Sequence, residues 1–241
     1  MKYGIISDVH ANLEALLAVK ESLEKDGVEE VFFLGDAVGY GANPNEVVEI
    51  LSDWVKIFIA GNHDMAAVGF TDITYFNPYA RQSILWTEKQ LSFRNQAFLK
   101  SLPYVIKRGN NTFVHASLEE PKRWHYILST DNALCNFRIL DTPICFIGHS
   151  HCPLIFACHK NQVVVTTDKK VLLEDSKKYI VNVGSVGQPR DENPMAAYAL
   201  LDTESKLLEI KRVPYNLILT QQKMRRVNLP SYLIERLTWG H

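Results

Sequence analysis

Apolar runs alternate with amphipathic stretches through the first 61 residues of the chain. The predicted elements are a strand at 2–6, a helix at 12–27, a strand at 29–35, a helix at 43–54 and a strand at 56–61. Gly27 ends the first helix, while Asn43 caps the second and Pro44 takes its first position. This β-α-β-α-β order predicts a parallel sheet with right-handed crossovers.

The rest of the chain changes from helical to strand-rich patterns. Residues 80–99 predict a helix, and 130–140 another, capped by Thr130 or Asp131. Strands are predicted at 104–108, 111–116, 144–148, 154–158, 162–167, 170–174, 179–183, 196–201 and 207–213. Their spacing favours a second, largely antiparallel sheet, and two short helical patterns follow at 215–226 and 230–237.

Together these elements predict an α/β chain with two sheets packed face to face and helices outside. We expect one domain over residues 1–241, since no repeat or long Gly/Ser/Pro linker divides it. Within it, a helical insert spans about 65–102 and a helical tail about 215–241.

Composition narrows the class of protein. The chain is 46 % apolar and 22 % charged with a net charge of −1, so a nucleic-acid partner is not expected. It has no run of about 18 apolar residues, which predicts no membrane span, and no secretory leader, which predicts a cytoplasmic protein. The four cysteines lack a C-x-x-C pair and are expected to be reduced.

Polar side chains that can bind a metal or move a proton follow five of the predicted strands. They are Asp8 and His10, then Asp36, then Asn62, His63 and Asp64, then His115, and finally His149 and His151. Ligands collect at the carboxyl ends of strands in such sheets, and alternate residues of an extended segment share a face. Each motif alone has an ordinary explanation as a turn or a buried histidine, but five coincident strand ends do not.

In this order the five motifs resemble those of the calcineurin-like metallophosphoesterases, and the layout covers the whole chain. The segments at 35–51 and 181–191 also resemble the small stand-alone bacterial and archaeal members. The resemblance implies a four-layer α/β/β/α sandwich, with two mixed sheets flanked by helices.

The resemblance further implies two divalent metal ions. The first would be held by Asp8, His10, Asp36 and His151, and the second by Asp36, Asn62, His115 and His149. This mixture of oxygen and imidazole donors suits Mn²⁺, with Fe, Zn²⁺ or Ni²⁺ as alternatives. A hydroxide held between the metals would attack phosphorus in line.

His63 would then act on the leaving group as a general acid or electrostatic stabiliser. Protein Ser/Thr phosphatases of the superfamily carry G-D-x-x-D-R-G, where this chain has Gly39 and Tyr40 in place of the second Asp and the Arg. Asp64 is therefore the candidate that polarises His63, and Arg190 and Asn62 are the candidates that contact the phosphate. Arg190 is equally well explained as an exposed turn residue.

These residues predict a metal-dependent phosphoesterase, a phosphatase or phosphodiesterase, that cleaves a nucleotide or another small phosphoester. A bacterial-type protein phosphatase is an alternative. A non-catalytic binding scaffold with the same fold is another, and a nuclease is disfavoured by the balanced charge. The oligomeric state is left open.

Overall fold

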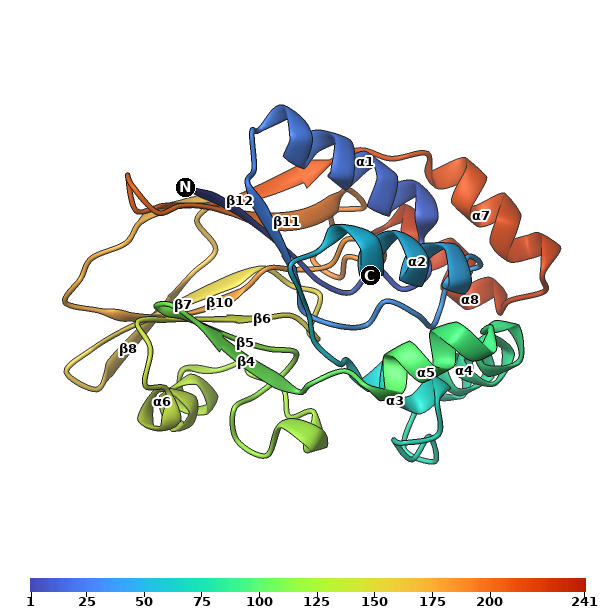
Figure 1. Ribbon diagram of the computed structural model, residues 1–241, viewed down its shortest axis with the longest axis horizontal. Helices are drawn as coiled ribbons and strands as arrows, with labels where there is room; N and C mark the ends of the chain where they lie inside the picture. The colour runs from blue at the N-terminus through green and yellow to red at the C-terminus, as the bar shows by residue number, and fades with distance from the viewer.

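Two six-stranded sheets pack against each other in the computed structural model, which describes residues 1–241 (Figure 1). The first sheet has the order β3-β2-β1-β11-β12-β9. Its strands are β1 (Lys2–Ile6), β2 (Glu30–Phe33), β3 (Ile57–Phe58), β9 (Lys170–Leu172), β11 (Ala196–Asp202) and β12 (Leu207–Val213). The first three are parallel, as predicted, and β11, β12 and β9 continue the sheet antiparallel.

The second sheet has the order β4-β5-β6-β10-β7-β8. Its strands are β4 (Val105–Arg108), β5 (Asn111–Val114), β6 (Ile144–Ile147), β7 (Leu154–His159), β8 (Gln162–Thr166) and β10 (Lys178–Asn182). This sheet is mixed, as the resemblance implies: its two central pairings, β5 with β6 and β6 with β10, are parallel, and its other three are antiparallel. The assignment of all the later strands to the second sheet is wrong, because β9, β11 and β12 belong to the first, where β11 completes the hydrogen bonds of the buried β1.

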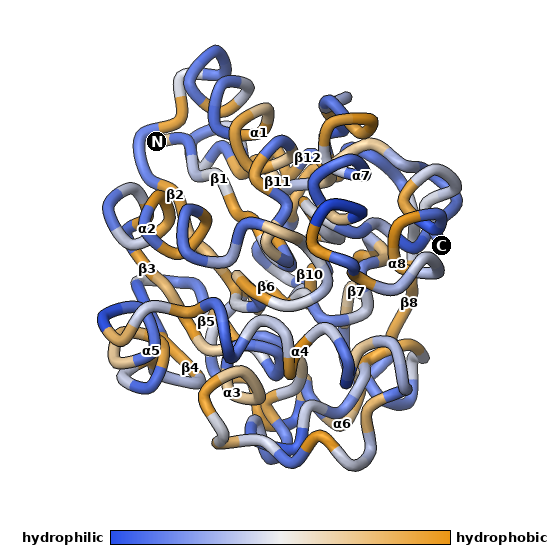
Figure 2. Tube along the Cα trace, turned by 90° about the vertical axis from the view of Figure 1, so that its right-hand side faces the viewer, coloured by the Kyte–Doolittle hydropathy of each residue, from blue (hydrophilic) through white to orange (hydrophobic).

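Helices cover both outer faces. They are α1 (Leu13–Lys25), α2 (Pro44–Trp54), α3 (Asn62–Ala67), α4 (Pro78–Gln90), α5 (Phe93–Lys100), α6 (Thr130–Ile139), α7 (Leu217–Arg226) and α8 (Ser231–Glu235), with 3-10 turns at Pro121–Arg123 and Arg236–Thr238. α1 and α2 pack on the first sheet, and α6 packs on β7, β8 and β10 of the second. The result is the four-layer sandwich, in which hydrophobic stretches lie on the strands and on parts of the helices (Figure 2).

Two helix boundaries differ from prediction, and a serine caps the helix at each of them. The predicted helix at 80–99 is divided at Leu91 and Ser92, where the Ser92 hydroxyl accepts the Asn95 N–H and starts α5. Ser129 caps α6, one residue before Thr130 and two before Asp131, the predicted caps.

The core between the sheets aligns the loops that follow their strands. Ile5 and Phe32 of the first sheet pack in one cluster with Phe113 and Phe146 of the second. None of the helices combines the length and apolarity that a bilayer span requires.

The C-terminal helices α7 and α8 pack beside the insert and the loop after β2. Leu233 and Leu237 share a buried cluster with Tyr40 and Ala80, and the Tyr79 and Tyr232 rings stack with centroids 4.7 Å apart. The end of the chain thus supports Tyr40, next to the site described below.

Candidate metal centre

The seven predicted ligands come together in one buried cluster, delivered by the loops after β1, β2, β3, β5 and β6. None is more than 7 % exposed: Asp8, His10, Asp36, Asn62, His115, His149 and His151. Strand ends that lie up to 141 residues apart in sequence therefore meet at one edge of the sandwich.

The donors form three overlapping groups. Asp8, His10 and His151 make one, Asp36, His115 and His149 make another, and His10, Asp36 and His63 make a third that links them, with all donor atoms of a group within 4.8 Å of one another. The Nε2 atoms of His10 and His115 lie 3.6 and 3.3 Å from the same atom, Oδ2 of Asp36. One carboxylate oxygen thus lies between the first two groups.

Three of the histidine rings are oriented by backbone carbonyls. The Nδ1–H groups of His10, His115 and His151 donate to the carbonyl oxygens of residues 38, 34 and 188 at 3.0, 2.7 and 2.5 Å. Since a carbonyl only accepts, Nδ1 carries a proton in each ring, and Nε2 is the ring atom that can bind a metal.

Left-handed backbone conformations orient the ligand side chains, rather than the alternation of side chains along an extended strand. Asp8, His10, Asp36, His149 and His151 have φ of 54°, 50°, 60°, 66° and 61°. The prediction that each pair shares a face because its segment is extended is therefore wrong. Non-glycine residues rarely adopt this conformation, and such strain collects at functional sites.

Two carboxylates are buried in the cluster without any lysine or arginine partner. Burial opposes their ionisation, yet nearby histidines hold the pKa of Asp8 and of Asp36 below the usual range. Burial also disfavours a charged His115, but Asp36 and Asp8 raise its pKa to about 9, so a proton supplies positive charge there. Burial lowers the pKa of His149 to about 3, which leaves that ring neutral.

This arrangement fits divalent metal ions. Asp8 Oδ1 and His149 Nε2 are buried without a hydrogen-bond partner, which is uncommon unless a cation or a ligand completes the site. Neutral imidazoles and carboxylates are the donors that Mn²⁺, Fe and Zn²⁺ bind in proteins. Exposed His159, at the end of β7, takes no part, and Cys152 donates its thiol to the Arg190 carbonyl.

His63 lies beside the cluster but is not oriented by Asp64, contrary to prediction. The Asp64 carboxylate accepts the backbone N–H groups of Asp36 and Gly61 through Oδ2, at 2.8 and 3.1 Å, and that of Val38 through Oδ1, at 3.2 Å. Burial and the charge of Asp36 raise the pKa of Asp64 to about 7. Asp64 thus ties the loop after β2 to the loop after β3.

The His63 ring is held by neighbouring rings. Its centroid lies 4.4 Å from that of Tyr40, 4.8 Å from that of His10 and 5.1 Å from that of Phe76, and its Nδ1 atom is buried without a partner. Burial keeps the pKa of His63 well below its ordinary value, so the ring is neutral.

Arg190 lies next to the position that carries an Arg in the protein phosphatases. Its guanidinium donates to Gln188 Oε1 at 2.8 Å and to the Tyr40 hydroxyl at 3.3 Å, and it lies over the Tyr40 ring at 5.7 Å. Tyr40 therefore holds the positive charge of Arg190, which comes from a distant part of the sequence, beside the loop after β2.

A cavity of about 640 Å³ opens on the site. Asn62, His63, Tyr40 and His149 line its inner end. Its outer walls come from the insert (Thr71, Asp72, Tyr75, Phe76, Asn77 and Ala80) and from the loop between β5 and α6 (Lys122, Arg123, Trp124 and Tyr126). The four loop residues are not among those singled out from the sequence. The cluster of basic and aromatic residues at 122–126 was the available signal.

The family profile and the relatives of this chain agree with the family that the five motifs resemble. The family profile described as "Calcineurin-like phosphoesterase superfamily domain" matches residues 1–206. An uncharacterized protein of Methanocaldococcus jannaschii is 40 % identical over 98 % of this chain and 97 % of its own length.

Among solved structures, a metallophosphoesterase from Sphaerobacter thermophilus is 38 % identical, with a TM-score of 0.87 over 100 % of this chain and 99 % of that one. A hypothetical protein from Pyrococcus horikoshii shares the fold at 19 % identity, with a TM-score of 0.81 over 100 % and 98 % of the two chains.

Proposed function

This chain belongs to the calcineurin-like phosphoesterase superfamily, and on that premise we propose that it is a phosphohydrolase that uses two divalent metal ions. Its substrate is a phosphomonoester or phosphodiester of a nucleotide or another small molecule. The observation that carries the proposal is the pair of buried donor groups on either side of Asp36 Oδ2. Two-metal phosphatase sites hold their ions about 3.5–4 Å apart, a spacing that one shared carboxylate supports.

Each ligand has a defined role in the proposal. Asp8, His10 and His151 hold the first ion, Asn62, His115 and His149 hold the second, and Asp36 contacts both. Bound divalent ions, with Mn²⁺ preferred, supply Lewis-acid stabilisation of phosphoryl oxygens and activation of water near neutral pH.

Two further side chains act on the substrate. The neutral ring of His63, at the inner end of the cavity, donates a hydrogen bond toward the leaving-group oxygen. Arg190 directs its guanidinium charge toward the equatorial phosphoryl oxygens from its position on Tyr40. The cavity of about 640 Å³ suits a substrate of nucleotide size.

Hydrolysis of para-nitrophenyl phosphate and of its bis-ester, with Mn²⁺ present, tests the proposal. We expect turnover by the wild type and a loss of about 10²–10³-fold in His63→Ala, the contribution typical of one hydrogen-bond donor that stabilises developing charge. His159→Ala, at an exposed histidine outside the site, is the matched control and should retain full activity.

A protein that binds Mn²⁺ but hydrolyses neither ester, with His63→Ala unchanged, would instead be a binding scaffold. Metal content measured on wild type and on Asp36→Asn separates loss of metal from loss of chemistry, because Asp36 contacts both donor groups.

A further inference from the structure

One wall of the cavity beside the metal centre is a single short loop, residues 120–126, which we call the recognition loop. It follows β5 and the ligand His115, and it lines the cavity through Lys122, Arg123, Trp124 and Tyr126. None of the five metal-binding motifs includes it. Its residues therefore lie within reach of a substrate without serving the metals.

The backbone of the recognition loop is strained on both sides of its 3-10 turn at Pro121–Arg123. Glu120 and Trp124 have φ of 47° and 59°. The left-handed region is uncommon for any non-glycine residue and is a marked outlier for one as bulky as tryptophan. Strain of this kind persists where it positions side chains for binding.

Tyr126 presents a flat aromatic surface. Its ring stacks on that of the ligand His149, with centroids 4.1 Å apart and planes 23° apart. The side chain is still 48 % exposed and lines the cavity, so it has surface left for a second ring. Stacking on an aromatic side chain is the general way in which proteins hold a nucleobase without sequence readout.

Trp124 and Lys122 offer unused donors on the same wall. The Trp124 indole packs edge-on against His115 at 5.8 Å, and its Nε1–H is buried without an acceptor. An indole N–H only donates, so an oxygen of a ligand would satisfy it.

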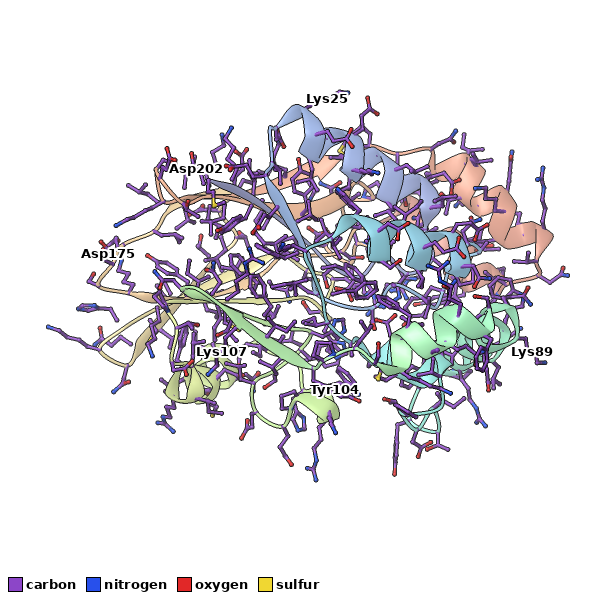
Figure 3. The ribbon with its side chains drawn as sticks, in the orientation of Figure 1. Lys25, Lys89, Tyr104, Lys107, Asp175 and Asp202 are labelled. Carbon is purple, nitrogen blue, oxygen red and sulfur yellow. The ribbon has the colours of Figure 1, made fainter.

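Lys122 Nζ lies 4.9 Å over the ring of Tyr104, which is labelled in Figure 3, and it makes no ion pair. Neighbouring Arg123 is by contrast paired with Glu120 at 3.3 Å. The charge of Lys122 is therefore available to an anion on the substrate.

We propose that the recognition loop binds the part of the substrate beyond the scissile phosphate and selects a nucleotide that carries an additional phosphate. The base stacks on Tyr126, and the additional phosphate meets Lys122 and the Trp124 indole N–H. This inference rests on the proposed function, because it assigns the scissile phosphate to the metal centre.

Calorimetric binding to the Mn²⁺-loaded protein tests each contact separately. The probes are adenosine 5′-(α,β-methylene)diphosphate, AMP and methylenediphosphonate, which differ by one phosphate or by the nucleoside. We expect Lys122→Met to weaken binding of the adenosine diphosphate analogue about tenfold and of AMP by less than twofold. Tyr126→Leu should weaken both nucleotides about tenfold but not methylenediphosphonate.

The control variant is Lys89→Met, at an exposed lysine of α4 outside the cavity (Figure 3), and it should change none of the affinities. A second readout is tryptophan fluorescence, which the analogue should quench in the wild type but not in Trp124→Phe. Metal content and thermal unfolding of each variant separate a misfolded site from a lost contact.

The outcomes distinguish a failure of the recognition loop proposal from a failure of the proposed function. Hydrolysis of para-nitrophenyl phosphate with Mn²⁺, together with nucleotide binding no tighter than that of methylenediphosphonate, overturns the recognition loop and leaves the proposed function standing. Absence of both metal binding and hydrolysis overturns the proposed function itself. Equal effects of Lys122→Met on AMP and on the diphosphate analogue overturn the assignment of the additional phosphate.

Discussion

The His63 ring is positioned by contact with its neighbours and not by a hydrogen-bonded carboxylate. Gly39 leaves the ring the space it occupies, since a Cβ at position 39 would lie 2.5 Å from His63 Nδ1. An Asp at position 39, as in the protein phosphatases, would require the ring to move. The position of the neutral His63 ring therefore requires a glycine at position 39.

Gly39→Ala should displace the His63 ring and lower kcat for the bis-ester about 10²-fold, the usual effect of a misplacement of about 1 Å. Metal content should stay at the wild-type level, because the three atoms nearest to the added Cβ all belong to His63, which is not assigned as a ligand. Gly109→Ala is the matched control: Gly109 also has a positive φ, of 56° against 86° for Gly39, but nothing lies within 4 Å of its Cβ position. Equal activities of the two variants would contradict this role of Gly39.

Asp64→Asn should destabilise the protein and reduce its metal content, because an NH2 group replaces one of the two carboxylate oxygens that accept three backbone N–H groups, which leaves at least one of those N–H groups without its acceptor. The free energy of unfolding should fall by about 1–3 kcal/mol, as measured by urea denaturation, while the pH profile of the remaining activity is unchanged. Asp53→Asn, at an exposed carboxylate, serves as the control. A shifted pH profile with unchanged stability would mean that Asp64 acts directly on His63.

At the scale of elements, the ligands were predictable wherever a motif directly follows an apolar run. Asp8 after β1 and His149 after β6 are examples. The partner of each strand was not predictable in this way, because β11 pairs with β1 from nearly 200 positions away and its apolar pattern suits either sheet. The left-handed turns and the recognition loop also escaped prediction, since neither has a periodic pattern.

The turn of the β7–β8 hairpin offers a substitution that should stabilise the protein without changing the metal centre. Lys160 and Asn161 form its two-residue turn, with φ of 48° and 63°. Both values are those of a type I′ turn, for which glycine is favoured at the second position. Asn161→Gly should raise the free energy of unfolding by about 0.5–1 kcal/mol, the scale of glycine effects at compatible positions.

The same urea denaturation measures this gain, and Asn161→Ala provides the opposite control, since alanine is disfavoured at positive φ. Metal content should be identical in both variants, because the turn is exposed and contains no predicted ligand. An Asn161→Gly protein less stable than Asn161→Ala would contradict the turn assignment.

For the whole molecule, the buried histidines link stability to pH and to metals. His149 and His151 have folded pKa values of about 3 against 6.5 in the unfolded chain. The unfolded chain therefore binds more protons between those values, so the stability of the metal-free protein falls as the pH drops below 6.5. Asp64, with a folded pKa of about 7, takes up one proton on folding and only partly offsets this loss.

His115 links stability to pH above 6.5. Its folded pKa of about 9 stabilises the metal-free protein below pH 6.5, and this contribution is lost as the pH rises to 9. A bound cation would replace that proton. Urea denaturation at pH 4, 5, 6.5 and 9, with Mn²⁺ or with EDTA, should therefore show metal stabilisation that grows from pH 6.5 to 9. A constant difference between the two curves would contradict this linkage.

The contact between Ser185 and Asp8 bears on when the metal ligands assemble during protein synthesis. The Ser185 hydroxyl donates to the carbonyl of Asp8, which was translated 177 residues earlier. At about 5–20 residues per second, the first ligand motif waits roughly 9–35 s on the ribosome before its supporting strands and loops exist. The nascent chain therefore carries an incomplete set of ligands for most of its synthesis, and metal loading belongs to the end of translation.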